Sequence, residues 1–124
     1  EILPYCRSKN ISVLAYSPLA IGLLSGDPRI IDRYRNSNYE WYSSENLDKS
    51  RGVLDMLRKV GLRRDKTTAQ VALNWILCKG NVIPITGPDS VEQLEENCDS
   101  VGWRLDDEEL DAIDTVARTI NLRT

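Results

Sequence analysis

Histidine is absent from this 124-residue sequence, and its absence removes several kinds of active site at once. The chain can contain no Ser-His-Asp triad, no Cys-His nucleophile pair and no histidine-ligated metal. Cysteine is scarce and lacks any Cys-x-x-Cys spacing, since Cys6, Cys78 and Cys98 lie far apart. We therefore predict no metal site, and three reduced core thiols in an intracellular protein.

An excess of either charge is also lacking. The 16 Lys and Arg against 19 Asp and Glu give a net charge of −3, and the basic residues are scattered. This distribution excludes general electrostatic binding to nucleic acid or to an anionic membrane. No apolar run approaches the roughly 18 residues that a membrane-spanning helix needs. We expect a soluble, cytoplasmic protein, with a plastid or another organelle as the alternative.

Two short apolar segments are typical of parallel strands covered on both faces. They are residues 11–17 (ISVLAYS) and 81–86 (NVIPIT), although Pro84 argues against a central position in a sheet. Residues 4–10 are expected to end a helix at Asn10, which tolerates a left-handed turn.

Four helices are expected from the spacing of apolar residues and from their caps. They cover residues 47–60 (ended by Gly61) and 67–79, and begin after Ser90 and after Asp106. The last three begin with capping boxes: Thr67 with Gln70, Ser90 with Gln93, and Asp106 with Glu109. This order of strands and helices predicts an α/β fold with parallel strands.

Three segments are expected to be irregular or solvated. Residues 27–46 show no periodicity and carry four aromatic residues, which indicates a loop that becomes ordered over a ligand. Residues 63–66 are predicted to be a solvated turn, and the acidic residues 106–109 a solvated first turn of a helix. We find no acid/base pair, and so predict no catalytic residue within the chain.

Residues 17–26 and 86–97 join strands to helices and are the best candidates for a ligand site. Gly87 precedes a helix start, where unpaired N–H groups and the helix dipole attract phosphate, although a plain helix cap is the alternative. Neither a Rossmann nor a P-loop fingerprint is present.

Four ordered motifs at these places resemble the final third of the aldo-keto reductase family. They are residues 15–26 (AYSPLAIGLLSG), 69–75 (AQVALNW), 82–87 (VIPITG) and 92–97 (EQLEEN), and the match runs from about Pro4 to Ala117. The resemblance implies strands 7 and 8, with their helices, of a (β/α)8 TIM barrel that reduces carbonyls with NADPH. Residues 1–124 would then be a partial oxidoreductase domain.

The resemblance also implies which residues hold the cofactor. Tyr16 would stack on the nicotinamide. The backbone of Ser17, Pro18, Leu19, Ala20 and Gly22 would follow the ribose and pyrophosphate, Gly87, Asp89 and Ser90 would face the 2′-phosphate, and Gln93, Glu96 and Asn97 would hold the adenosine. One of Arg29, Arg33 or Arg35 would add a charge to the pyrophosphate.

Two departures concern the cofactor, because Asp27 and Asp89 stand where many members of the family carry a basic residue. These two acidic residues make NADH an alternative cofactor to NADPH. The family's catalytic Tyr, Lys, Asp and His come from earlier strands, and Glu1 maps to the end of the sixth helix. We therefore expect a truncated product or fragment whose start is missing, which self-associates or needs a complementary barrel fragment.

Three functions follow from the resemblance. The chain is the cofactor-binding part of a reductase acting on a small aldehyde or ketone, or a non-catalytic nucleotide-binding subunit such as those associated with channels, or a remnant without function. An intact catalytic set upstream would favour the enzyme.

Overall fold

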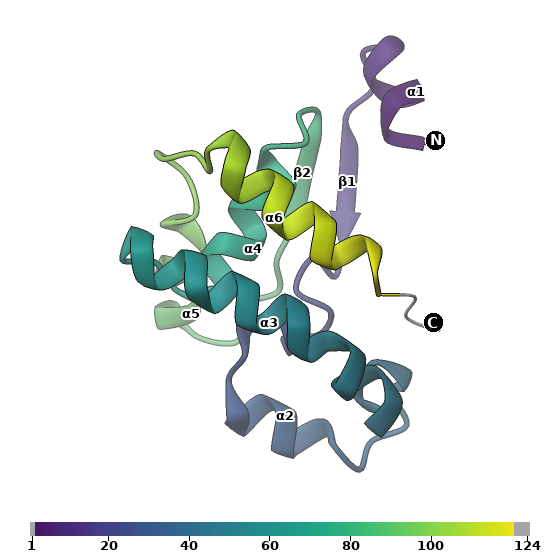
Figure 1. Ribbon diagram of the computed structural model, residues 1–124, viewed down its shortest axis with the longest axis vertical. Coiled ribbons are helices and arrows are strands. Elements are labelled where there is room, and N and C mark those ends of the chain that lie inside the picture. The colour runs from purple at the N-terminus through teal and green to yellow at the C-terminus, as the bar shows by residue number, and fades with distance from the viewer. Residues whose placement is uncertain (1, 121–124) are drawn as a thin grey trace.

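The computed structural model describes residues 2–120, in which two strands alternate with helices (Figure 1). The elements are α1 (Ile2–Ser8), β1 (Val13–Tyr16), the 3₁₀ turn η1 (Leu23–Ser25), α2 (Pro28–Tyr34), the 3₁₀ turn η2 (Glu40–Tyr42), α3 (Ser44–Arg64), α4 (Thr68–Leu77), β2 (Val82–Ile85), α5 (Val91–Cys98) and α6 (Asp107–Arg118). The expected α/β alternation is confirmed. The left-handed turn at Asn10 is also present, with φ 54°.

The two strands pair in parallel, as predicted, with Val13 opposite Val82 and Tyr16 opposite Ile85. Of the two faces predicted to be covered, the described residues cover only one. Alternate side chains of the pair share one face, and all four are 47–87% exposed: Leu14, Tyr16, Ile83 and Ile85. We call these four residues the bare sheet face. The opposite face is covered by helices, with α4 in contact with β2.

The main core lies between three helices on the covered side of the sheet. Helices α3 and α6 run side by side across the front of Figure 1, with α4 behind them. Its buried members come from all three helices and the segment before α6: Val53, Leu57, Val60, Val71, Ala72, Leu105 and Ile113. Because burying a Val, Leu or Ile side chain contributes about 1.5–3 kcal/mol, this core fixes the helices against the strands.

Two of the predicted capping boxes are present. At α4, Thr67 Oγ1 accepts from the Gln70 N–H at 3.2 Å while Gln70 Oε1 accepts from the Thr67 N–H at 2.9 Å. At α6, Asp106 and Glu109 make the same reciprocal pair. These local bonds satisfy N–H groups that a helix start leaves unpaired.

Helix α3 continues past Gly61, so the predicted helix end was wrong. It ends at Arg64, and the following cap residue, Asp65, has a left-handed backbone (φ 53°) that lets its N–H bond to the Gly61 carbonyl. Gly61 is buried where the chain turns into α4, and a Cβ there would lie 2.5 Å from the Lys66 carbonyl oxygen. The glycine is therefore explained by the close approach of the backbone at residue 66.

The segment 27–46 is folded, contrary to the expectation of a structureless loop. Asp27 caps α2 by accepting from the Arg29 N–H at 2.8 Å, and Pro28 occupies the first turn. Residues from this segment and the preceding one form a second small core around Ala20, Leu23 and Tyr42.

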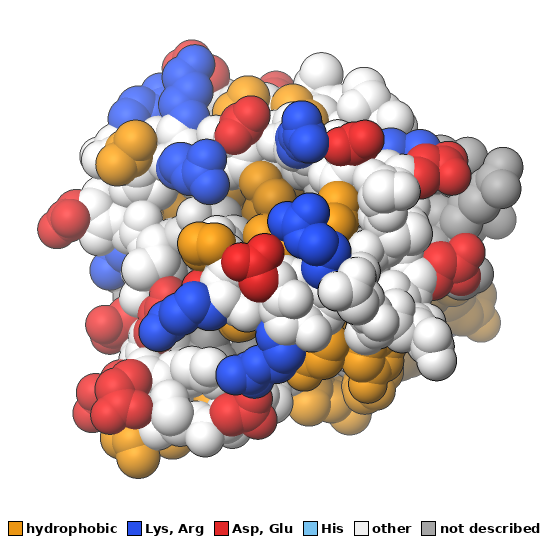
Figure 2. Space-filling model, turned by 90° about the horizontal axis from the view of Figure 1, so that it is seen from below, with side chains coloured by type: hydrophobic (Ala, Val, Ile, Leu, Met, Phe, Trp, Pro, Cys, Tyr) orange, Lys and Arg blue, Asp and Glu red, His pale blue; other side chains and the backbone are white. Residues whose placement is uncertain are grey.

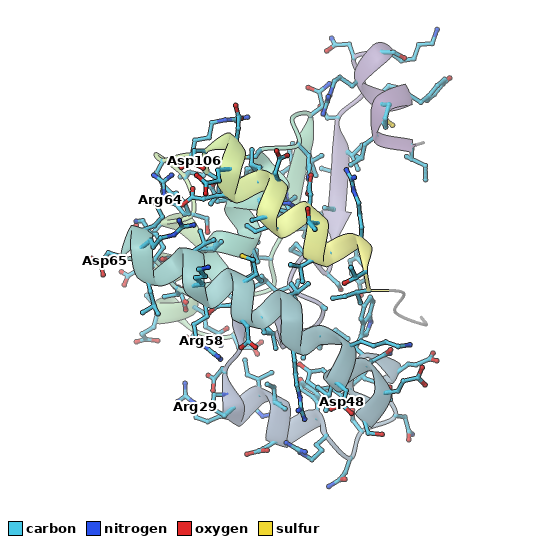
Figure 3. The ribbon with its side chains drawn as sticks, viewed as in Figure 1. Arg29, Asp48, Arg58, Arg64, Asp65 and Asp106 are labelled. Carbon is cyan, nitrogen blue, oxygen red and sulfur yellow. The ribbon has the colours of Figure 1, made fainter. Side chains whose placement is uncertain are left out.

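The predicted solvated turns at residues 63–66 and 106–109 are confirmed for most of their residues, but Glu109 is buried and pairs with Arg64. Arg64 donates to Glu109 at 2.6–3.1 Å and to Asp106 at 3.0 Å, and Figure 3 shows Arg64 beside Asp106. The Glu109 side chain is only 4% exposed, and its hydrogen bonds with Arg64 hold the pKa of that carboxyl below its usual value. This pair ties the end of α3 to the start of α6.

The cysteines are free thiols, but their predicted core location is wrong for Cys98, which is exposed, whereas Cys6 and Cys78 are half-buried. Among residues 2–120 no helix combines the length and apolarity needed to cross a membrane.

Candidate functional site

The parallel pairing of β1 and β2 brings the two predicted strand-to-helix junctions to one edge of the sheet. Tyr16 lies opposite Ile85, so the chain leaves both strands side by side at their carboxyl ends. One exit leads into residues 17–22, and the other into residues 87–90 and the start of α5. Ligands of parallel α/β folds are bound at this edge.

Residues 17–22, which we call the loop 17–22, have an unusual backbone. Ser17, Ala20 and Ile21 have left-handed φ angles of 49°, 50° and 55°, and Gly22 follows with 87°. Such conformations cost non-glycine residues on the order of 1 kcal/mol or more each, and most for a β-branched side chain. The contacts around the loop must therefore hold it in place.

The predicted residues of this first junction differ in accessibility. The Tyr16 ring is 87% exposed at the end of β1, as a stacking surface must be. Ser17, Pro18, Leu19 and Gly22 are half-buried, and Ala20 is buried. Ala20 donates its N–H to the Ser17 carbonyl at 2.9 Å, so the loop is compact.

The second junction places Gly87, Asp89 and Ser90 in solvent before α5. Ser90 Oγ accepts from the Gln93 N–H at 3.2 Å, which is the first half of the predicted capping box. The second half is wrong, because Gln93 Oε1 accepts from the Asp89 N–H at 2.7 Å rather than from Ser90. The Gln93 side chain thus fixes the turn and keeps its amide nitrogen as a donor.

Two acidic side chains lie at the start of α5. The Glu92 carboxylate accepts from its own backbone N–H and from the Ser90 hydroxyl, and these bonds lower its pKa. Asp89 stands three residues earlier and is exposed. A phosphate at this helix start would meet negative charge, which opposes the attraction of the helix dipole.

Gln93, Glu96 and Asn97 lie on one face of α5 and are half-buried, whereas Val91, Glu92, Leu94 and Glu95 are exposed. The helix is attached to α4 by Gln70, whose Nε2 donates to the Glu96 carbonyl at 3.0 Å. The sequence marked Gln70 only as a cap of its own helix. Its second bond depends on the packing of α5 against α4, which no local pattern encodes.

Of the arginines proposed for the pyrophosphate, two have acidic partners. Arg29 pairs with Asp27 at 2.8 Å, and Arg35 with Asp32 at 3.4 Å. Acidic and basic side chains are interspersed on the surface seen in Figure 2, so this face carries no broad positive patch. Within residues 2–120, no group of three or more Cys, Asp or Glu side chains is arranged to hold a metal ion.

Comparison with known proteins adds a family. The model of the Aldo/keto reductase family matches residues 1–118. The chain is 32% identical over 121 residues to an aldo-keto reductase of Strobilurus tenacellus, covering 94% of the chain and 36% of that protein. It is 36% identical over 121 residues to an uncharacterized oxidoreductase of Mycobacterium bovis, covering 95% of the chain and 37% of that protein.

Among solved structures, the glycerol dehydrogenase of Gluconobacter oxydans superposes with a TM-score of 0.79 at 30% identity. That match covers 100% of the chain and 39% of the dehydrogenase. The chain therefore spans a little over a third of the length of these relatives, and its fold is part of a (β/α)8 barrel.

Proposed function

The chain belongs to the aldo/keto reductase family, and from that premise we propose that it is the part of a reductase that holds NADPH. The observation that carries the proposal is the meeting of the loop 17–22 and the start of α5 at one edge of a parallel strand pair. In (β/α)8 barrels, the loops after the last two strands and a nearby helix start frequently form a phosphate site.

Each part of the cofactor has a matching group at this edge. The exposed Tyr16 ring offers a flat surface to the nicotinamide. Backbone groups of the loop 17–22 follow the ribose and pyrophosphate, and Gly87 and Ser90 lie at the 2′-phosphate. Gln93 directs its amide nitrogen to the adenosine, beside Glu96 and Asn97.

The cofactor preference follows from the charges at α5. Asp89 and Glu92 weaken the hold on the 2′-phosphate, so NADH is bound as well as NADPH. When bound, either cofactor supplies a hydride to the carbonyl carbon of an aldehyde or ketone. The proton that completes the alcohol comes from an acid on a part of the barrel outside this chain.

In this proposal the rest of the barrel covers Leu14, Ile83 and Ile85 of the bare sheet face, whereas Tyr16, at the carboxyl end of β1, stays open to the nicotinamide. The four apolar side chains of this face, Leu14, Tyr16, Ile83 and Ile85, are 47–87% exposed in residues 2–120. Exposed apolar sheet faces promote association. Further strands, from the same polypeptide or from a complementary fragment, complete the barrel.

A cofactor titration tests the proposal. NADPH binding to the full polypeptide carrying this chain is followed by quenching of tryptophan fluorescence. Gln93→Ala should weaken NADPH binding several-fold, because a hydrogen bond to a neutral group such as adenine contributes about 0.5–1.5 kcal/mol. Leu94→Ala is the control, since Leu94 is uncharged, adjacent and 48% exposed. Equal affinities for the two variants would contradict the placement of the adenosine on this face of α5.

A further inference from the structure

We propose that Tyr42 is a positioning residue for the cofactor, because it holds the loop 17–22 in its strained conformation from the aromatic segment 34–42. This inference rests on the proposed function. Tyr42 is 1% exposed, and its hydroxyl donates to the carbonyl oxygen of Ile21 at 2.8 Å. The bond joins residues that are 21 positions apart in the sequence.

The carbonyl that Tyr42 holds belongs to the most strained residue of the loop. Ile21 is β-branched and has a left-handed φ of 55°, between Ala20 at 50° and Gly22 at 87°. Strained residues persist only where the surrounding structure fixes them. The Tyr42 hydroxyl is the side-chain donor that fixes this residue, among the hydrogen bonds of the described chain.

Packing beneath the loop cannot replace that bond. Ser17, Pro18 and Ala20 border a mostly apolar cavity of about 430 Å³ that extends toward α3, α4 and α6. On this side the loop has open space instead of tightly packed neighbours. Its geometry therefore depends on Tyr42, which packs with Ala20 and Leu23 in the second small core and does not itself line the cavity.

Tyr42 is itself held firmly. The centroid of its ring lies 5.2 Å from that of the Tyr34 ring. The Tyr34 ring in turn contacts Tyr39 edge to face, with 5.5 Å between the two ring centroids. The Asn46 side chain donates to the Glu40 carbonyl at 2.7 Å and closes the turn that carries Tyr42. Burial raises the pKa of Tyr42 to about 12, so the hydroxyl remains a donor at neutral pH.

The Tyr42 hydrogen bond affects the affinity for the cofactor and not the chemical step. A loop that follows the ribose and pyrophosphate binds more tightly when its backbone already has the bound geometry. Without the Tyr42 hydroxyl, the loop samples other conformations and part of the binding free energy is used to order it.

The test compares Tyr42→Phe with Tyr39→Phe in the full polypeptide. Tyr39 is 48% exposed, and among the described residues its hydroxyl makes no hydrogen bond, so its variant controls for loss of a phenol. We expect Tyr42→Phe to weaken NADPH binding about five- to ten-fold and Tyr39→Phe to leave it unchanged. In the cofactor-free protein, hydrogen exchange at the Leu23 and Leu24 amides should accelerate only in Tyr42→Phe.

A second variant acts on the loop itself. Asparagine tolerates left-handed backbone, so in an Ile21→Asn background the penalty of Tyr42→Phe on NADPH affinity should fall below two-fold. Equal NADPH affinity in Tyr42→Phe and Tyr39→Phe, or a penalty of unchanged size in the Asn background, would overturn the inference. If the unaltered protein bound no NADPH, the proposed function would fail first, which is a distinguishable result.

Discussion

Gly61 and Gly52 lie in the same helix, α3, and replacing each by alanine should have opposite effects on stability. A Cβ at Gly61 would lie 2.5 Å from the backbone carbonyl oxygen of Lys66, and one at Gly52 would lie 3.3 Å from a methyl group of Val116. The first neighbour is backbone, which closes the turn through the Lys66 N–H to Gly61 bond of 2.9 Å. The second is a side chain that can shift.

The magnitude follows from two terms. Within a helix, Gly→Ala gains about 0.8–1.0 kcal/mol, and this gain is common to both variants. Forcing atoms into a packed region costs about 1–3 kcal/mol, and at Gly61 the upper part of this range, about 2–3 kcal/mol, applies because the backbone cannot move aside. We expect Gly61→Ala to lower the free energy of unfolding by about 1–2 kcal/mol and Gly52→Ala to raise it by up to about 1 kcal/mol.

Urea unfolding followed by far-ultraviolet circular dichroism measures the free energy of unfolding of both variants. If the dependence of this free energy on urea concentration is the same in both, their unfolding midpoints can be compared directly. The difference between the variants isolates the clash, because helix propensity cancels. If Gly61→Ala unfolds at the same or a higher urea concentration than Gly52→Ala, the close approach of residue 66 to α3 is refuted.

Two further predictions concern the ion pair and the isolated chain. Glu109→Gln keeps a capping side chain but loses the charge that pairs with Arg64, so the melting temperature at pH 7 should fall by about 5 °C, and Glu108→Gln should change it little. Because the pKa of Glu109 is lowered in the folded state, the stability that its carboxylate adds is present above pH 4.5 and is lost as the pH falls further. If the melting temperature of Glu109→Gln were lowered as much at pH 3 as at pH 7, the pairing would be contradicted. The isolated chain should not oxidise NADPH with any aldehyde faster than a denatured sample. It should also self-associate in sedimentation through the bare sheet face; a monodisperse monomer with a cooperative melt would exclude this.

Local signals predicted much of the fold. The caps at Thr67 and Asp106 were found because a capping box lies within four residues of sequence. The parallel pairing of residues 13–16 with 82–85 followed from the alternation of strands and helices. A similar signal for α2, the cap Asp27 followed by Pro28, is present in the sequence, although the segment lacks helical periodicity.

Features created by tertiary contact could not be predicted in this way. The sequence predicts a helix end at Gly61, because its close neighbour, Lys66, matters only after the chain has turned into α4. The Arg64–Glu109 pair joins helices 45 positions apart in the sequence. At the candidate site, the motifs located both junctions. The Gln93 bond to the Asp89 N–H and the hold of Tyr42 on Ile21 needed three-dimensional packing to be found.

The most direct test of the central claim measures cofactor affinity after charge reversal at the start of α5. If the loop 17–22 and α5 hold the dinucleotide as proposed, Asp89→Lys should tighten NADPH binding by about ten-fold and leave NADH almost unchanged, since only NADPH carries the 2′-phosphate. Isothermal titration of the full polypeptide with both cofactors gives the two dissociation constants. An equal response of NADPH and NADH, or no response of either, would contradict the placement of the cofactor at this edge of the sheet.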